Sequence, residues 1–136
     1  MTLTDTGPLV ALVDENDPHN LRVVEALAAI RSWPLATTEA CLTEVMYLTG
    51  KTAGRAAQSA IWRFFEDGSL SVLPHATEGT KRAKAYMERF SDIPCDYADA
   101  TLLVAAEDTG LRRIFTLDKH FYAYRLAGGD YLDVIP

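Results

Sequence analysis

Short apolar stretches with strand character alternate along the chain with longer stretches that repeat apolar residues at helical spacing. In the stretch 16–31, for example, Leu21, Val24 and Leu27 lie on one face of a helix. The pattern predicts strands at 2–5, 33–37, 69–74, 112–118 and 130–136. It predicts helices at 9–15, 16–31, 37–50, 53–68, 77–90 and 96–110, with a short helix or turn at 119–125.

Residues with strong capping preferences mark the ends of the predicted helices. Asp17 is placed as the N-cap of the second helix, with Pro18 as its first residue. The third helix offers a choice of two caps, Thr37 or Thr38. Glycine leaves the helical conformation at low cost, and we expect a glycine to end three of the helices: Gly50, Gly68 and Gly110.

The alternation of strands and helices predicts an α/β fold with a mainly parallel sheet of about five strands. The chain has no repeat, low-complexity tract or linker, and its 136 residues fit one domain that spans 1–136. In such sheets, ligands bind beyond the carboxyl ends of the strands, where the strand order reverses. Acidic residues at those ends are therefore the first candidates for a functional site.

Two of the predicted strands end in an aspartate. Asp5 and Asp118 close the strands at 2–5 and 112–118, and a helix start follows each of them. Either aspartate taken alone could be a turn or capping residue. Taken together, they place two carboxylates at the same edge of the sheet.

Glu44 lies in the middle of the helix at 37–50, which is apolar on nearly all sides. Its neighbours on the helix surface include Ala40, Cys41 and Leu48, so we expect this helix to be largely buried. A glutamate in such a position requires a partner. The partner could be an arginine or a metal ion shared with other acids.

Asp96 and Asp99 stand three residues apart at the start of the helix at 96–110 and share a face of it. Asp96 is well placed as the N-cap. Asp99 lies beside Leu102 and Leu103, which are apolar. We therefore interpret Asp96 first as a helix cap, with contact to a metal ion through water as its alternative role, and Asp99 as a metal ligand.

Four acids from separate elements could then converge: Asp5, Glu44, Asp99 and Asp118. Such a cluster would repel itself without cations, and its oxygen ligands favour hard ions such as Mg²⁺ or Mn²⁺. An ion held by carboxylates suits phosphoryl chemistry, because it activates water and stabilises the leaving group. His120 follows Asp118 closely, and an exposed surface histidine is its simpler interpretation.

The net charge of −6 argues against nonspecific binding to nucleic acid, for which a basic surface is expected. An enzyme of this charge could act on nucleic acid only with metal ions at its site. One local excess of basic residues flanks Asp118, and we expect it either to steer a nucleic-acid backbone or to be a solvated face. It consists of Arg112, Arg113, Lys119 and Arg125.

Other features favour a cytoplasmic protein. The N-terminus lacks the basic region and the long apolar run of a signal peptide. No stretch approaches the ~18 apolar residues of a membrane span. The two cysteines, Cys41 and Cys95, show no metal-ligand spacing, and we expect them to be buried, reduced thiols.

The chain resembles PIN-domain ribonucleases, specifically the VapC-type toxins of bacterial and archaeal toxin–antitoxin pairs. The matching segments are "DTGPLVAL" near the N-terminus, "TEACLTEVMYL" around Glu44, "CDYADATLLVAAEDTGLRRIFTLDKHF" and the final "YLDVIP". The similarity runs over nearly the whole length. No single motif is decisive, but their order, spacing and combination are together fairly specific.

The resemblance implies a three-layer α/β/α fold with a central parallel sheet and an acidic pocket that binds Mg²⁺ or Mn²⁺. The implied ligands of this pocket are Asp5, Glu44, Asp99 and Asp118. Thr6 and Thr116 are implied to support them. The resemblance also implies RNA as the substrate, a cognate antitoxin that lies across the toxin, and a homodimer.

The leading interpretation is a metal-dependent endoribonuclease that acts as a toxin. Two alternatives stay open: an inactive module of the same fold that binds a partner protein, and a phosphatase or DNA nuclease that uses the same acids. We expect the aromatic residues Trp62, Phe64 and Phe65 to lie in the core, with a groove for a partner protein as the alternative.

Overall fold

Five short parallel strands form the centre of the molecule, and the computed structural model describes all of residues 1–136. Their order across the sheet is β3-β2-β1-β4-β5, and every neighbouring pair is parallel. The strands are β1 (Thr2–Thr4), β2 (Leu35–Thr38), β3 (Leu70–Leu73), β4 (Arg113–Phe115) and β5 (Asp133–Ile135). The predicted parallel sheet is confirmed, and its strand order reverses at β1.

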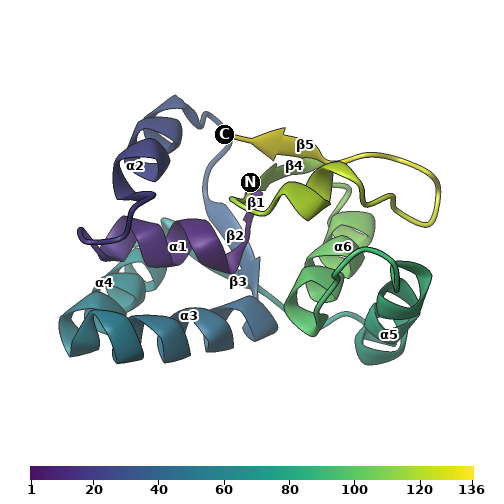
Figure 1. Ribbon diagram of the computed structural model, residues 1–136, viewed down its shortest axis with the longest axis horizontal. Helices are drawn as coiled ribbons and strands as arrows, with labels where there is room; N and C mark the ends of the chain where they lie inside the picture. Colours follow the sequence, from purple (N-terminus) through teal and green to yellow (C-terminus); the bar gives the residue numbers. More distant parts are fainter.

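Helices cover both faces of the sheet, which confirms the expected three-layer α/β/α arrangement (Figure 1). The helical elements are α1 (Thr6–Val13), α2 (Asn20–Ala29), α3 (Glu39–Thr52), α4 (Gly54–Glu66), α5 (Gly79–Arg89), α6 (Tyr97–Thr109) and the short 3-10 turn η1 (Lys119–Tyr122). Because side chains alternate along a strand, Phe115 enters the core with α1 to α4, whereas Ile114 enters the core with α5 and α6. The sheet therefore separates two hydrophobic cores.

Local capping chemistry sets several helix ends as predicted. The Thr38 hydroxyl caps α3 by accepting a hydrogen bond from Cys41 N at 3.3 Å. Asp96 caps α6, and Gly110 ends that helix in the left-handed conformation, with φ of 74°. Gly68 follows α4 in the same conformation, with φ of 80°.

The start of α2 differs from the prediction. Asp17 does not cap this helix, because its carboxylate accepts a hydrogen bond from His19 N at 2.8 Å within a preceding turn. The helix begins three residues later, at Asn20, and Pro18 lies outside it. Asn20 instead ties the helix start to α1 by donating from Nδ2 to the Ala11 carbonyl at 2.7 Å.

Gly50 does not end α3, which continues to Thr52. The break between α3 and α4 falls at Gly54, whose φ of 78° lies in the left-handed region. A Cβ atom at Gly50 would lie 2.5 Å from Nε2 of Gln58, the flexible end of a side chain on α4. The prediction mistook a glycine inside the helix for a helix stop.

The helix α3 is buried along one face only, so the prediction that it is largely buried is wrong. It buries one row of side chains, Cys41, Val45 and Thr49. Tyr47 is 66% exposed, and Leu48 is exposed beside it. The helix packs on the sheet through one face only, and apolar composition alone does not reveal which apolar side chains face solvent.

The aromatic residues of α4 divide between core and surface. Phe64 packs partly buried against the core, as predicted. Trp62 and Phe65 are 46% and 47% exposed, so the prediction that they belong to the core is wrong. Their rings meet edge to face, with centroids 6.1 Å apart. Large apolar side chains are thus exposed on both α3 and α4.

Both cysteines are free thiols. Cys41 is fully buried between α3 and α6, and its Sγ lies 3.9 Å from the Ala98 carbonyl. Cys95 is only half-buried, just ahead of α6. The prediction of two buried thiols is therefore confirmed for Cys41 and wrong for Cys95.

Candidate acidic active site

Asp5 lies at the carboxyl end of β1, at the point where the strand order reverses. It is 7% exposed, and both of its carboxylate oxygens accept hydrogen bonds. Oδ1 accepts from Thr6 N at 2.7 Å and thereby caps α1. Oδ2 accepts from the Thr116 hydroxyl at 2.7 Å. The capping interpretation of Asp5 is correct, and the cap lies at the predicted edge of the sheet.

Two threonines each link acids from different elements. The Thr6 hydroxyl donates to Glu44 Oε2 at 3.0 Å, while the Thr6 amide binds Asp5. The Thr116 hydroxyl donates to Asp5 and accepts from Asp118 N at 3.0 Å. The two threonines thus bring Asp5, Glu44 and Asp118 to one place from β1, α3 and the segment after β4.

Asp96 and Asp99 form a capping box at the start of α6. Asp96 Oδ1 accepts a hydrogen bond from Asp99 N at 2.8 Å, and Asp99 Oδ2 accepts one from Asp96 N at 3.1 Å. The prediction that Asp96 caps this helix is confirmed. Asp99 is 8% exposed, but its carboxylate also takes part in the cap. The two acids therefore share the capping role that the sequence assigned to one of them.

Asp118 caps the short turn η1 and holds His120. Its Oδ1 accepts a hydrogen bond from His120 N at 2.8 Å and lies 2.7 Å from His120 Nδ1. His120 is exposed, which confirms its interpretation as a surface histidine, and it also contacts a candidate metal ligand. The signal in the sequence is its position two residues after an aspartate that starts a turn.

Burial is the main cause that raises the pKa of Asp5 to about 6. The hydrogen bonds from Thr116 and Thr6 act in the opposite direction, because they stabilise the charged form. They do not offset the loss of hydration, and the nearby carboxylate of Asp118 raises the pKa further.

The pKa of Asp99 is raised further than the pKa of Asp5. Burial raises the pKa of Asp99 to about 8, and the charges of Asp96 and Asp5 add to the shift. Burial also raises the pKa of Glu44. Asp5, Asp99 and Glu44 form no ion pair with any lysine or arginine, so the expected alternative of an arginine partner for Glu44 is wrong. The acids repel one another at a place that lacks positive charge.

The donor set of this cluster fits a hard divalent cation. Its side chains offer carboxylate oxygens, which Mg²⁺ and Mn²⁺ prefer as ligands. A bound ion of this kind would also supply the positive charge that the cluster lacks. The carboxylates are hydrogen-bonded to nearby amides and hydroxyls, and no three or more His, Cys, Asp or Glu side chains are already arranged to hold one ion. Binding a metal would require some of these carboxylates to turn toward it.

Arg112 and Arg113 lie away from the acids. They stand at the amino end of β4, whereas the acids lie beyond the carboxyl ends of the strands. Arg112 Nη2 pairs with Asp130 at 3.2 Å, and Arg113 Nε pairs with Asp133 at 3.0 Å. Asp133 is the register partner of Arg113 on β5. The predicted basic stretch is therefore not gathered at the acidic cluster.

Lys119 and Arg125 are the basic residues of this stretch that form no ion pair. Lys119 directly follows Asp118 and is exposed. Arg125 donates to the Tyr124 carbonyl at 2.8 Å, and its guanidinium carbon lies 3.4 Å from the ring centroid of Tyr131. Only Lys119 is both free and adjacent to a candidate ligand.

A cavity of about 540 Å³ opens between the start of α3, the segment that joins β3 to α5, and α6, but it is not the acidic site. Its wall on α6 includes Tyr97, Thr101 and Val104. Helical geometry places these residues on the side of α6 opposite Asp99 and Leu103. The cavity and the acid cluster are therefore on different faces of the same helix.

Comparison with known proteins gives a sequence relative and a structural neighbour, whereas no model of a known protein family matches the chain. Ribonuclease VapC26 of Mycobacterium tuberculosis is 28% identical over 135 residues, which cover 98% of this chain and 99% of the relative. VapC20 of the same organism, a sarcin-ricin loop cleaving toxin of known crystal structure, superposes with a TM-score of 0.82 at 18% identity, with both chains fully covered. The two comparisons confirm the resemblance of this chain to the VapC-type PIN-domain proteins, in sequence and in fold.

Proposed function

We propose that the chain is a metal-dependent endoribonuclease and the toxin of a type II toxin–antitoxin pair, acting in the cytoplasm. The observation that carries the proposal is the cluster of buried acids at the switch point of the sheet, in which the pKa of Asp99 is raised to about 8. The names of the relatives support the choice of substrate, because VapC26 is a ribonuclease and VapC20 a toxin that cleaves the sarcin-ricin loop.

The proposed ligands come from β1, α3, α6 and the segment after β4: Asp5, Glu44, Asp99 and Asp118. A bound Mg²⁺ or Mn²⁺ would supply positive charge, lower the pKa of an attacking water and stabilise the leaving oxygen. Thr6 and Thr116 orient the carboxylates through the hydrogen bonds described above. Asp96, which is exposed beside Asp99, would reach the ion through water. Hydrolysis would leave 5′-phosphate and 3′-hydroxyl ends.

Lys119 is the proposed contact to the RNA backbone. It is exposed, free of ion pairs and adjacent to Asp118, so its ammonium group can approach a phosphate next to the acids. Arg125 is a weaker candidate, because backbone carbonyls and the Tyr131 ring already hold its guanidinium. The ion-paired Arg112 and Arg113 are not part of this proposal.

The test is cleavage of RNA by the purified protein with Mn²⁺, with EDTA as the metal-free control. Asp5→Asn should abolish cleavage in vitro and relieve growth arrest in cells. Asp92→Asn is the matched control, because Asp92 is exposed and lies outside the cluster. Equal cleavage by the two variants would overturn the proposed mechanism. Single-stranded DNA and a phosphate monoester as parallel substrates separate a ribonuclease from a DNA nuclease or phosphatase.

We propose that the cognate antitoxin covers the apolar surface of α3 and α4. The surface is defined by Tyr47, Leu48, Trp62 and Phe65. Large exposed aromatic residues are typical anchors of protein interfaces. Trp62→Ser should weaken binding of the antitoxin and leave cleavage of RNA by the free toxin unchanged.

Light scattering of the purified chain tests the proposed homodimer. None of the helices combines the length and the hydrophobicity required to span a membrane.

A further inference from the structure

Tyr124 lies in the segment between η1 and β5, which leads away from the acidic cluster. Its side chain is fully buried between Phe121 and Phe90, with ring centroids 5.0 Å from each. None of the residue patterns considered in the sequence points to this tyrosine. The available signal is its three-residue spacing from Phe121, which places both rings on one side of a helical turn.

The hydroxyl of Tyr124 meets both the backbone and a carboxylate at the start of α6. It donates a hydrogen bond to the Pro94 carbonyl, two residues before the N-cap Asp96. It also lies 3.5 Å from Asp99 Oδ2, the same oxygen that accepts from Asp96 N. A buried hydroxyl in this position restrains the path of the chain into α6 and the rotation of the Asp99 carboxylate.

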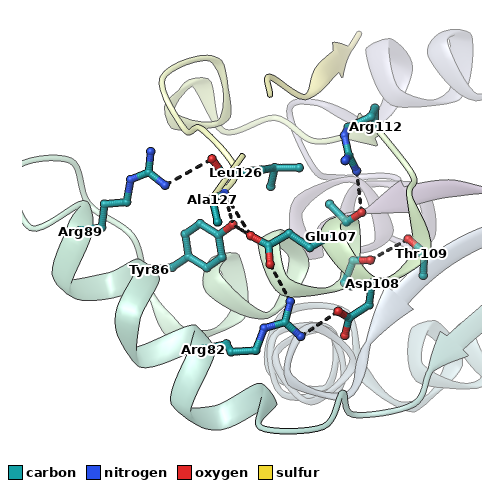
Figure 2. A network of polar contacts seen from close by, with 11 residues as sticks. Arg82, Tyr86, Arg89, Glu107, Asp108, Thr109, Arg112, Leu126 and Ala127 are labelled. Atoms are coloured by element: carbon teal, nitrogen blue, oxygen red, sulfur yellow. Dashed lines mark hydrogen bonds and ion pairs between the residues drawn. The ribbon is translucent and has the colours of Figure 1, made fainter. Parts of the chain in front are cut away.

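A polar network around Glu107 holds the segment that carries Tyr124 (Figure 2). Glu107 Oε1 accepts hydrogen bonds from Ala127 N at 3.1 Å and from the Tyr86 hydroxyl, while Oε2 accepts from Arg82 Nη2 at 2.6 Å. Figure 2 shows these groups converging from α5, α6 and the segment that contains Ala127. Because Ala127 follows Tyr124 by three residues, this attachment fixes how deeply the tyrosine enters the core.

We propose that Tyr124 is a positioning residue for Asp99, whose carboxylate it keeps within reach of a divalent ion by restricting its rotation. The inference rests on the proposed function, because Asp99 is a metal ligand only there. Tyr124 itself touches neither the ion nor the RNA. It acts by restricting the Pro94–Asp96 backbone and by facing Asp99 Oδ2. A partner of this kind keeps a ligand preorganised, so its loss weakens metal binding more than it changes the reaction of the bound substrate.

The test compares Tyr124→Phe, which removes only the hydroxyl, with Tyr122→Phe as the matched control. Tyr122 lies in η1, is 59% exposed and has no hydrogen-bond partner for its hydroxyl. Mn²⁺ binding, measured by calorimetry, should weaken roughly tenfold in Tyr124→Phe and stay at the wild-type value in Tyr122→Phe. The Mn²⁺ concentration for half-maximal cleavage should rise by the same factor, while cleavage at saturating Mn²⁺ is retained.

Amide hydrogen exchange in the metal-free proteins gives a readout that does not depend on activity. The amides of Asp96 and Asp99, which form the capping box, should exchange faster in Tyr124→Phe, while those of α4 stay unchanged. Faster exchange across α4 as well would mark a merely structural role and overturn the proposal. Unchanged Mn²⁺ affinity would overturn it and leave the proposed function intact. A wild-type protein that binds no Mn²⁺ would overturn the metal site, and this proposal with it.

Discussion

The two ends of α6 carry carboxylates in opposite electrostatic surroundings. Near its C-terminal end, burial alone would raise the pKa of Glu107, but hydrogen bonds from Tyr86, Arg82 and Ala127 N lower that pKa below its ordinary value. At its N-terminal end, burial and neighbouring acids raise the pKa of Asp99 to about 8. One carboxylate is compensated within the fold, and the other is not.

The difference separates an acid that stabilises structure from one that is available for a ligand. A compensated carboxylate such as Glu107 holds its charge and fixes the elements around it. An uncompensated carboxylate such as Asp99 costs folding free energy when it is ionised, and a bound cation removes that cost. Strongly perturbed acids without a cationic partner are therefore candidates for function, which is the basis of the proposed metal site.

The largest expected effect comes from neutralising the uncompensated acid. Asp99→Asn should lower RNA cleavage by roughly a hundredfold or more, because even outer partners of metal ligands are typically worth 10- to 100-fold. Glu107→Gln should retain most of the activity at saturating Mn²⁺. Cleavage assays of the two purified variants at the same saturating Mn²⁺ concentration check this prediction. The comparison fails if Glu107→Gln loses as much activity as Asp99→Asn.

The acids themselves could be proposed from the sequence, because the signals for them are local. Asp5 and Asp118 follow strands, and Asp96 and Asp99 open a helix, so strand ends and capping rules suffice to find them. The prediction of Glu44 rests on the burial of α3, and the structure contradicts that premise because α3 is buried along one face only. Its contact with a threonine of α1 depends on how two helices pack.

The second effect concerns stability and should appear at the compensated acid. Glu107→Gln should lower the free energy of unfolding by about 1–3 kcal/mol, because it leaves the charge of Arg82 and the amide of Ala127 poorly paired. Glu88→Gln is the matched control, since the exposed pair of Glu88 with Lys84 should contribute at most about 0.5 kcal/mol. Urea unfolding of both variants gives the comparison, and equal losses would contradict it.

Pairings between distant residues could not be predicted from the sequence. The sequence predicts a local excess of positive charge from Arg112 onward, but Arg112 and Arg113 are paired with Asp130 and Asp133. The pair of Arg113 with Asp133 arises from the register of β4 with β5. The exposure of Trp62 has a similar origin, because it depends on which face of α4 meets the sheet rather than on hydrophobicity. Local rules give caps and periodicity, whereas register and packing decide partners.

A third prediction follows from the raised pKa values. The pKa values of Asp5 and Asp99 in the folded protein, about 6 and about 8, exceed the ordinary value of 3.8, so the folded state binds these protons more tightly than the unfolded chain. The two protonated carboxyl groups contribute fully to stability below about pH 4. This contribution is lost as the pH rises through 6 for Asp5 and through 8 for Asp99. Without metal, we expect the free energy of unfolding to fall by on the order of 1–3 kcal/mol between pH 5 and pH 8.

Urea unfolding between pH 5 and pH 8, with EDTA or with Mg²⁺, checks this prediction. Mg²⁺ should restore stability mainly at the higher pH, where the acids are ionised. Asp99→Asn should flatten the metal-free profile, because it removes the group with the larger shift. Glu107 contributes with the opposite sign, since its lowered pKa gives stability that is lost as the pH falls. An unchanged slope in Asp99→Asn would contradict the proposed cause.

The smallest effect tests whether Asp96 is only a cap. Asp96→Ala should lower the free energy of unfolding by about 1 kcal/mol, because the hydrogen bond from Asp99 N loses its acceptor. Asp96→Asn keeps that acceptor and removes the charge, so its stability should match that of the wild type. If Asp96 also reaches a metal ion through water, Asp96→Asn should weaken Mn²⁺ binding while stability is retained. Equal Mn²⁺ affinity in Asp96→Asn and the wild type would limit Asp96 to the capping box, and Asp99 would then be the acid of this pair that faces the ion.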